Sequence, residues 1–330
     1  MNTEQSNTTT PRRVLTIDGG GIKGVFPAAF LADLESELDQ PLASYFDLVV
    51  GTSTGGIIAI ALGLGVPAAD ILKFYEDKGP HIFKGSKRFG PLRQLVTAKY
   101  DPAPLNAALS EVFGDRKLGE SSTRLVIPSL NLSTGEVNVF KTAHHERFER
   151  DYKMLAVDAA MATAAAPTYF PTHRLTNGVP LVDGGMWANN PMGTAAVEAI
   201  GLLEWPKGSI ELLSVGCTDA PANFKASQER RHGLANYWAK RIVKVFMSGQ
   251  SSASIGTAML LLGHDRVVRV SPSVDENQYR LDGVEGIPEL RALGADQART
   301  QLPLLRKRFF TDIKEPFVPV RSLENPEVYR

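Results

Sequence analysis

Residues 46–64 of the chain read FDLVVGTSTGGIIAIALGL, and this stretch decides the fold. It opens with an apolar run of strand length and closes with a small-residue run of helix length, and Gly51-Thr52-Ser53-Thr54-Gly55 stands between them. Gly-x-Ser-x-Gly between a strand and a helix is the pattern of a turn that presents a nucleophilic serine. The turn is too tight for bulky side chains at Gly51 and Gly55, and it leaves Ser53 at a helix N-terminus, which stabilises developing negative charge. The alternative is a structural turn in which Ser or Thr only caps the helix.

Short apolar runs alternate with helical patterns along the first half of the chain. Runs of strand length occupy residues 13–17, 46–50, 124–132, 137–142, 179–182 and 210–215. Helical patterns occupy residues 26–38, 56–64, 234–262 and 288–310. Alternation of this kind favours a parallel sheet covered by helices, so the sequence predicts an α/β fold.

The chain is interpreted as one domain with a tail and an extension. Residues 1–12 are polar and predict a disordered tail, residues 13–215 predict the core, and residues 216–330 predict a mostly helical extension packed on the same domain. Within the core, residues 68–119 contain four prolines that break them into short helical pieces. A region of this kind, set between core strands, often forms a cap, so we expect a helical cap there.

Composition limits the classes of protein that the chain can belong to. Lys+Arg and Asp+Glu both number 36, so the net charge is zero, which disfavours a general nucleic-acid binder. A single cysteine, Cys217, excludes an internal disulfide. The N-terminus lacks the pattern of a signal peptide, and the longest apolar stretch, residues 55–69, is too short to span a bilayer. We therefore expect a soluble cytoplasmic protein.

A glycine-rich segment, Asp18-Gly19-Gly20-Gly21-Ile22-Lys23-Gly24, follows the first strand. Its glycines fit the string G-x-G-x-x-G, so a dinucleotide site is an alternative. Such a site would place an acid at the end of the second strand, whereas Asp47 stands near its start. The favoured interpretation is a row of backbone N–H groups that bind the oxyanion of an acyl-transfer intermediate. Lys23 would add positive charge there, or it is a solvated residue of the first turn.

A third segment, Asp183-Gly184-Gly185, follows the apolar run at 179–182 and supplies a carboxylate. A serine hydroxyl needs a neighbouring base, and the usual base is a histidine oriented by an aspartate. None of the six histidines stands in a glycine-framed position at a strand end, whereas Asp183 does, and its glycines allow a close approach to Ser53. Two catalytic arrangements stay open: a desolvated Asp183 that acts as the base itself, or a triad that uses His232 or His264.

The three segments together, in this order, resemble the patatin-like phospholipases. Residues 165–171 (AAPTYFP) and Asn189-Asn190-Pro191 match that family as well, and the resemblance runs from about residue 13 to residue 203. It implies a three-layer α/β/α sandwich with a central, mostly parallel sheet, and catalysis by a Ser-Asp dyad without histidine, metal or cofactor. Carried onto this chain, Ser53 is the nucleophile and Asp183 the base, and the oxyanion hole is formed by Gly19, Gly20 and Gly21. The implied reaction hydrolyses an acyl ester of a membrane phospholipid through an acyl-serine intermediate.

A narrower resemblance concerns compact bacterial members of the family that serve anti-phage defence and are switched on by a cyclic dinucleotide. It implies an enzyme that degrades the membrane of its own cell. We expect such an enzyme to act from the cytoplasm at the inner membrane surface, and a homo-oligomer stays open. Six basic residues and one acid lie between Lys225 and Lys244. We therefore predict that Arg241 and Lys244 help to bind an anionic effector; the alternative is an amphipathic helix with a solvated basic face.

Overall fold

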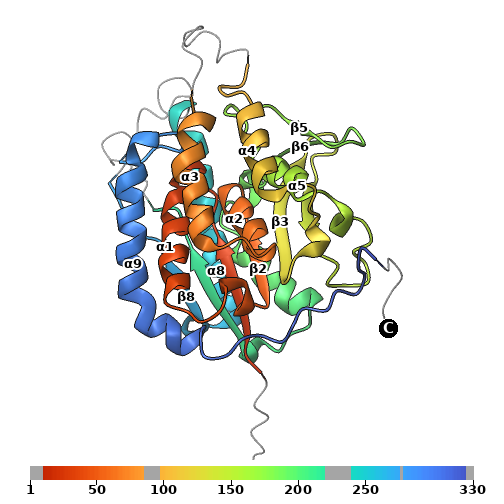
Figure 1. Cartoon of the computed structure of the whole chain (residues 1–330), viewed down its shortest axis with the longest axis vertical. Helices are drawn as coiled ribbons and strands as arrows, with labels where there is room; N and C mark the ends of the chain where they lie inside the picture. The colour runs from red at the N-terminus through yellow and green to blue at the C-terminus, as the bar shows by residue number, and fades with distance from the viewer. Residues whose placement is uncertain (1–9, 85–96, 220–238, 276–277, 325–330) are drawn as a thin grey trace, which may run out of the picture.

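The computed structural model describes residues 10–84, 97–219, 239–275 and 278–324. It contains a mixed sheet with helices on both faces (Figure 1). The predicted tail lies mostly outside the described residues. The strands are β1 (Arg12–Ile17), β2 (Leu48–Gly51), β3 (Arg124–Asn131), β4 (Val137–Lys141), β5 (His173–Arg174), β6 (Pro180–Asp183), β7 (Ile210–Val215) and β8 (Val267–Val270). The helices are α1 (Val25–Ser36), α2 (Thr54–Gly63), α3 (Ala68–Ile82), α4 (Ala103–Phe113), α5 (Ala156–Thr163), α6 (Gly185–Ala188), α7 (Met192–Val197), α8 (Ala239–Leu262) and α9 (Ile287–Arg308).

The sheet has the order β5-β6-β3-β2-β1-β7-β8, and β4 pairs with β3 outside this path. β3, β2, β1, β7 and β8 are parallel to one another, while β4 and β6 run antiparallel to β3, and β5 is antiparallel to β6. The carboxyl ends of the parallel strands therefore meet at one edge of the sheet. In an open α/β sheet this is the edge where ligands bind.

One edge of β3 is shared by two strands. Val126 pairs with both β2 and β4, and Leu130 pairs with both β4 and β6, so β2 and β6 must lie on the edge opposite β4. β2 ends with Gly51 and β6 ends with Asp183, which pairs with Ser129. The carboxyl ends of two strands thus point toward each other along β3, a placement that brings the residues after β2 to the residue that ends β6.

The strands alternate between two apolar cores, one on each face of the sheet. Leu15, Val49 and Leu213 face the core that holds α1 to α5 and α9. Their neighbours Val14 and Leu212 face a smaller core that holds α7 and α8. Figure 1 shows α9, α1 and α3 in front of the sheet and α8 behind it. Strands buried on both faces have nearly continuous apolar runs, as the sequence has here, and the predicted three-layer sandwich is confirmed.

The residues after 215 contribute to all three layers. β8 extends the sheet beside β7, α8 covers the rear face beside α7, and α9 packs along α1. The predicted cap region forms α3 and α4, which lie in the front layer against α1 and α5. Residues 85–96 of the cap and 220–238 of the extension lie outside the described residues.

The contact between α9 and α1 depends on a glycine. A Cβ at Gly294 would lie 2.6 Å from the carbonyl oxygen of Phe26 and 2.8 Å from the Cβ of Ala29. A Cβ added at Gly256, on α8, would meet no heavy atom within 4 Å. Both residues are inside helices, where alanine is intrinsically favoured over glycine by up to about 1 kcal/mol.

We predict that Gly294→Ala lowers the free energy of unfolding by about 1–3 kcal/mol, because the added methyl group forces the two helices apart. Gly256→Ala should leave it unchanged or raise it slightly. Urea denaturation of the two variants and the parent measures both effects. Equal effects of the two substitutions would contradict the close packing of α9 on α1.

Candidate active site

Ser53 occupies a strained turn between β2 and α2. Its backbone has φ 56° and ψ −123°, a region that L residues rarely adopt and that costs about 1–3 kcal/mol. A Cβ at Gly51 would lie 2.1 Å from the carbonyl oxygen of Gly55, and a Cβ at Gly55 would lie 2.2 Å from that of Ile17. Both predicted glycines are therefore required by close backbone contacts, and the turn has the geometry of a nucleophile elbow.

Thr163, the last residue of α5, holds this turn in place. The N–H of Ser53 donates to the hydroxyl of Thr163 (3.0 Å), and that hydroxyl donates to the carbonyl of Pro128 on β3 (2.6 Å). All three groups are buried. On the other side of the turn, the hydroxyl of Thr52 donates to the carbonyl of Ala188 (2.6 Å). These bonds fix the turn to β3 through Thr163 and to the end of α6 through Ala188.

Asp183 lies beside Ser53 at the end of β6. The hydroxyl of Ser53 hydrogen-bonds to its carboxylate, and the N–H of Gly185 donates to Oδ1 at 2.6 Å. Both side chains are nearly buried, Ser53 being 8% and Asp183 5% exposed. Burial raises the pKa of Asp183 to about 6, and the hydrogen bonds from Ser53 and Gly185 oppose this rise only in part. Gly184 allows the close approach, because a Cβ there would lie 2.3 Å from the carbonyl oxygen of Pro128.

The glycine-rich loop after β1 packs against the serine turn. A Cβ at Gly19 would lie 3.1 Å from the Cβ of Ser53 and 2.4 Å from Oδ1 of Asn189. Gly21 has φ 57°, and its backbone lies against the carbonyl of Leu281. Side chains at these positions would push the loop away from Ser53.

Four backbone N–H groups around Ser53 differ in whether they already have an acceptor. The N–H of Gly19 donates to the carbonyl of Asn189 (2.9 Å), so it is already used within the fold. In the part of the chain that the structure describes, no acceptor is recorded for the N–H groups of Gly20 and Gly21, or for that of Thr54 at the start of α2. Thr54 directly follows the serine, which is the position that commonly completes an oxyanion hole. The sequence motif pointed to the glycines and missed Thr54.

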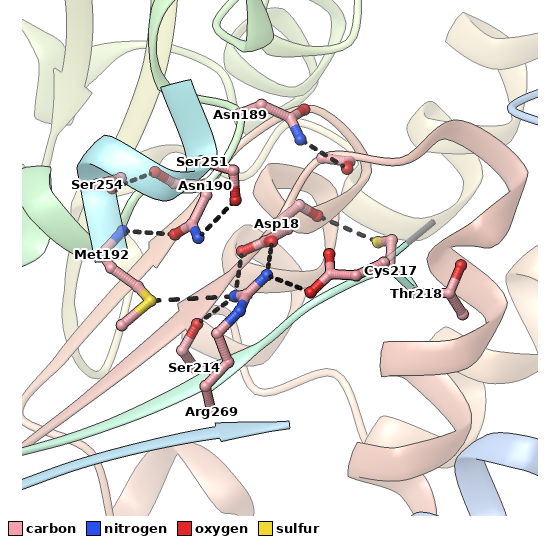
Figure 2. A network of polar contacts seen from close by, with 12 residues as sticks. Asp18, Asn189, Asn190, Met192, Ser214, Cys217, Thr218, Ser251, Ser254 and Arg269 are labelled. Carbon is pink, nitrogen blue, oxygen red and sulfur yellow. Dashed lines mark hydrogen bonds and ion pairs between the residues drawn. The ribbon is translucent and has the colours of Figure 1, made fainter. Parts of the chain in front are cut away.

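The loop is anchored by an ion pair that the sequence did not reveal. Asp18 is bound by both terminal nitrogens of Arg269 on β8, at 3.3 and 2.7 Å, and Arg269 also donates to Ser214 at 2.8 Å (Figure 2). Burial raises the pKa of Asp18, and the charge of Arg269 opposes that rise. The ammonium of Lys23 lies 3.4 Å from the carbonyl of Thr218.

α8 binds the segment that follows Asp183. Gln250 accepts the N–H of Asn189 (2.5 Å) and donates to the carbonyl of Gly185 (3.3 Å). The side-chain amide of Asn190 donates to Ser251 (3.1 Å), and the hydroxyl of Ser254 donates to the carbonyl of Asn190 (2.6 Å), as Figure 2 shows. The segment between β6 and α7 is therefore held between the glycine-rich loop and α8.

Other predicted residues lie elsewhere. His264 stands between α8 and the start of β8, at the edge of the sheet opposite to Ser53, so it cannot serve as its base. His232 lies outside the described residues, as does the side chain of Arg241. Lys244 lies on α8, six residues before Gln250. Within the described ranges, no group of three or more His, Cys, Asp or Glu side chains could hold a metal ion.

The family model for patatin-like phospholipases matches residues 15–196, which hold the serine turn, the glycine-rich loop and Asp183. The chain belongs to the patatin-like phospholipase family. A "cGAMP-activated phospholipase" of Escherichia coli (strain TW11681) is 37% identical over 341 residues, covering 92% of this chain and 94% of the relative. Another of that name, from Pseudomonas aeruginosa (strain BWHPSA011 / Pa011), is 37% identical over 73% of this chain and 72% of the relative.

The similarity extends to plants. Patatin-like protein 2 of Oryza sativa is 32% identical over 295 residues, covering 76% of this chain and 72% of the relative. Among solved structures, VipD from Legionella pneumophila aligns with 92% of this chain and 69% of its own, at a TM-score of 0.44 and 13% identity. Family membership indicates that the chain is a lipid-hydrolysing enzyme.

The buried carboxylate predicts a pH-dependent effect on stability. The pKa of an aspartate in the unfolded chain is near 3.9, and the pKa of about 6 in the fold means that the folded state holds its proton more tightly. The stability of the parent therefore falls as the pH rises from about 4 through 6. Asp183→Asn removes this ionisation. We predict that the free energy of unfolding of the variant, minus that of the parent, rises by about 2 kcal/mol when the pH is raised from 4 to 8.

Urea denaturation of the parent and the variant at both pH values measures this gain. Asp47→Asn is the matched control: Asp47 is also buried, but it is paired with Arg12 (3.1 Å) and accepts the N–H of Arg13 (2.9 Å), so its replacement should destabilise the fold. A difference between Asp183→Asn and the parent that stays constant with pH would show that the carboxyl group is not desolvated.

Proposed function

We propose that this chain is a phospholipase that hydrolyses acyl esters of membrane phospholipids, with Ser53 as nucleophile and Asp183 as general base. The observation that carries the proposal is the hydrogen bond between the Ser53 hydroxyl and a buried carboxyl group whose pKa is raised to about 6. A base is most useful when its pKa lies near the working pH, because it is then ionised at neutral pH and still binds a proton well. An exposed aspartate would be too weak a base for this task.

The chemistry follows from the positions of these groups. Asp183 accepts the hydroxyl proton of Ser53 as the Ser53 oxygen attacks the ester carbonyl. The N–H groups of Gly20, Gly21 and Thr54 stabilise the negative oxygen of the tetrahedral intermediate. When the intermediate collapses, the ester C–O bond breaks, and the lysophospholipid oxygen takes the proton from Asp183. Water, deprotonated by Asp183, then releases the fatty acid from Ser53 and returns its proton to the Ser53 oxygen.

An apolar cavity of about 370 Å³ lies close to these groups and offers room for part of an acyl chain. Its lining includes Leu105, Met161 and Phe170, together with Ala165, whose carbonyl accepts the N–H of Asp183 at 3.1 Å. Polar side chains, including Asn106 and Arg174, stand among the lining residues. An apolar wall with a few polar groups is the usual character of a site for an amphipathic ligand.

We predict that Ser53→Ala and Asp183→Asn each lower fatty-acid release from phospholipid vesicles by at least about 10³-fold, because each removes a member of one catalytic unit. His232→Ala and His264→Ala should keep most of the activity. The measurement is quantification of free fatty acid, with labelling by a fluorophosphonate probe as a readout of Ser53 alone. Loss of activity in either histidine variant, with the fold intact, would support a Ser-His-Asp triad instead.

We further propose that a cyclic dinucleotide controls the enzyme. Support comes from the relatives named as cGAMP-activated phospholipases, one of which is similar over nearly the whole chain. A phospholipase that is always active would damage the membranes of its own cell, so control of this kind is consistent with the chemistry. Arg241 and Lys244 remain our predicted contacts for the anionic effector.

We predict that cGAMP raises fatty-acid release from phosphatidylethanolamine and phosphatidylglycerol vesicles at least tenfold over the free enzyme, whereas other cyclic dinucleotides have a smaller effect. The Ser53→Ala protein is the control and should release nothing with any nucleotide. Charge reversal at both Arg241 and Lys244 should weaken the response. Full activity without nucleotide would show that the enzyme is not gated in this way.

A further inference from the structure

The start of α8 extends beyond the carboxyl edge of the sheet. Gln250 is level with that edge, because it binds Gly185 and Asn189, while Leu262 packs near Val267 at the start of β8. The eight residues from Gln250 back to Ile242 add about 12 Å at about 1.5 Å per residue. Figure 1 shows the first turns of α8 at the end of the molecule where α3 ends. This projecting part of α8 stands at the same edge of the sheet as Ser53.

Apolar side chains are exposed on this projecting part. Val243 is 69% and Phe246 52% exposed, and Ile242 is exposed as well. Val243, Phe246, Gln250 and Ser254 are spaced by three, four and four residues, so they lie on one face of the helix. Gln250 and Ser254 use that face to bind residues 185–193. Val243 and Phe246 therefore lie on the same face of α8 as Gln250 and Ser254. In this part of α8, however, the described residues leave the two side chains largely uncovered.

Two more exposed apolar side chains border the same edge. Met186 follows Gly185, whose N–H binds Asp183, and Leu281 presents its carbonyl to the N–H of Ile22 in the glycine-rich loop. Together these side chains make up what we call the docking surface: Met186, Ile242, Val243, Phe246 and Leu281. α8 contains no acidic residue, and three of its first six residues are basic.

We propose that the docking surface contacts the surface of an anionic phospholipid bilayer and brings the edge that holds Ser53 to the lipid. The identity of the partner rests on the proposed function, because the ester to be cleaved lies in a bilayer. Apolar side chains that enter the boundary of the acyl chains contribute about 25 cal/mol per Å² of buried area, and basic residues nearby add attraction to anionic headgroups.

α8 meets the surface of the bilayer and does not cross it. By length and composition, residues 242–262 could span a membrane. In the fold, however, Gln250, Ser251 and Ser254 are bound to residues 185–193, and Ala258 and Leu262 pack beneath the sheet. Insertion of α8 would break these bonds and leave their polar groups without partners in hydrocarbon, at several kcal/mol for each group.

The test uses the double variant Val243→Ser/Phe246→Ser, and Leu260→Ser is its matched control. Leu260 is also on α8 and is 85% exposed, but it lies toward the opposite edge of the sheet. Vesicles of phosphatidylethanolamine and phosphatidylglycerol are sedimented with each protein in a Ser53→Ala background, so that the lipid stays intact. We expect the double variant to bind at least tenfold more weakly than the parent, and Leu260→Ser to bind within about twofold of it.

The same substitutions with Ser53 present separate binding from chemistry. We expect the double variant to hydrolyse vesicle lipid at least tenfold more slowly, yet to cleave a soluble short-chain ester at the rate of the parent. Unchanged vesicle binding in the double variant would overturn the proposal. A change of oligomeric state, with an equal loss of activity on both substrates, would also overturn it, because it would mark a contact between copies of the chain. These hydrolysis assays contain cGAMP, the proposed activator. If the parent then cleaves neither substrate, the proposed function fails, while the vesicle sedimentation still tests the surface.

Discussion

The shared edge of β3 is the constraint on which the site depends. β2 reaches it from one end and β6 from the other, and Pro128 lies between the levels at which the two strands stop. Proline offers no N–H, so neither strand can continue its ladder past this point. The carbonyl of Pro128 is bound instead by the hydroxyl of Thr163, which in turn accepts the N–H of Ser53. The turn after β2 is thereby fixed to β3 beside the end of β6, which pairs with Ser129, and Ser53 and Asp183 meet although 130 residues separate them.

Asp183 and Asp18 are both desolvated, but they have different partners. Both are buried, and both follow or end a strand at the carboxyl edge. Asp18 has Arg269 as a bidentate partner, so its charge is balanced and it anchors the glycine-rich loop. Asp183 has only a hydroxyl and one backbone N–H, which leave its pKa near 6. The two buried carboxyl groups thus differ in their partners: Asp18 is paired with a cation, whereas Asp183 is bound only by neutral groups, one of which is the hydroxyl of Ser53.

Much of this arrangement could be predicted from local sequence. The strand before Ser53, the glycines around it and the helix after it are encoded within 19 residues, and Asp183 stands out because two glycines follow it. Thr163 carries no such signal, since it lies in an alanine-rich helix and acts only through residues 35 and 110 positions away. The partner of Asp18 lies on β8, and the antiparallel direction of β6 depends on its pairing with β3. The use of the Gly19 N–H by Asn189 likewise follows from the tertiary fold, because it requires the segment after β6 to lie against the loop after β1.

A continuous set of hydrogen bonds links α8 to Asp183 and to the glycine-rich loop. Gln250 binds Gly185 and Asn189; Asn189 binds Gly19, and Gly185 binds Asp183. A shift of α8 along its axis would therefore act on Asp183 and on the glycine-rich loop together. A ligand or a lipid surface at the start of α8 can change catalysis through this route only if it binds one position of the helix better than another. Gln250, Ser251 and Ser254 hold α8 by hydrogen bonds, whereas the residues nearer the end of α8 make apolar contacts. Exchanging hydrogen-bond partners changes the free energy by only about 1 kcal/mol per bond. The difference in free energy between two positions of α8 would therefore be small enough for a bound ligand to supply.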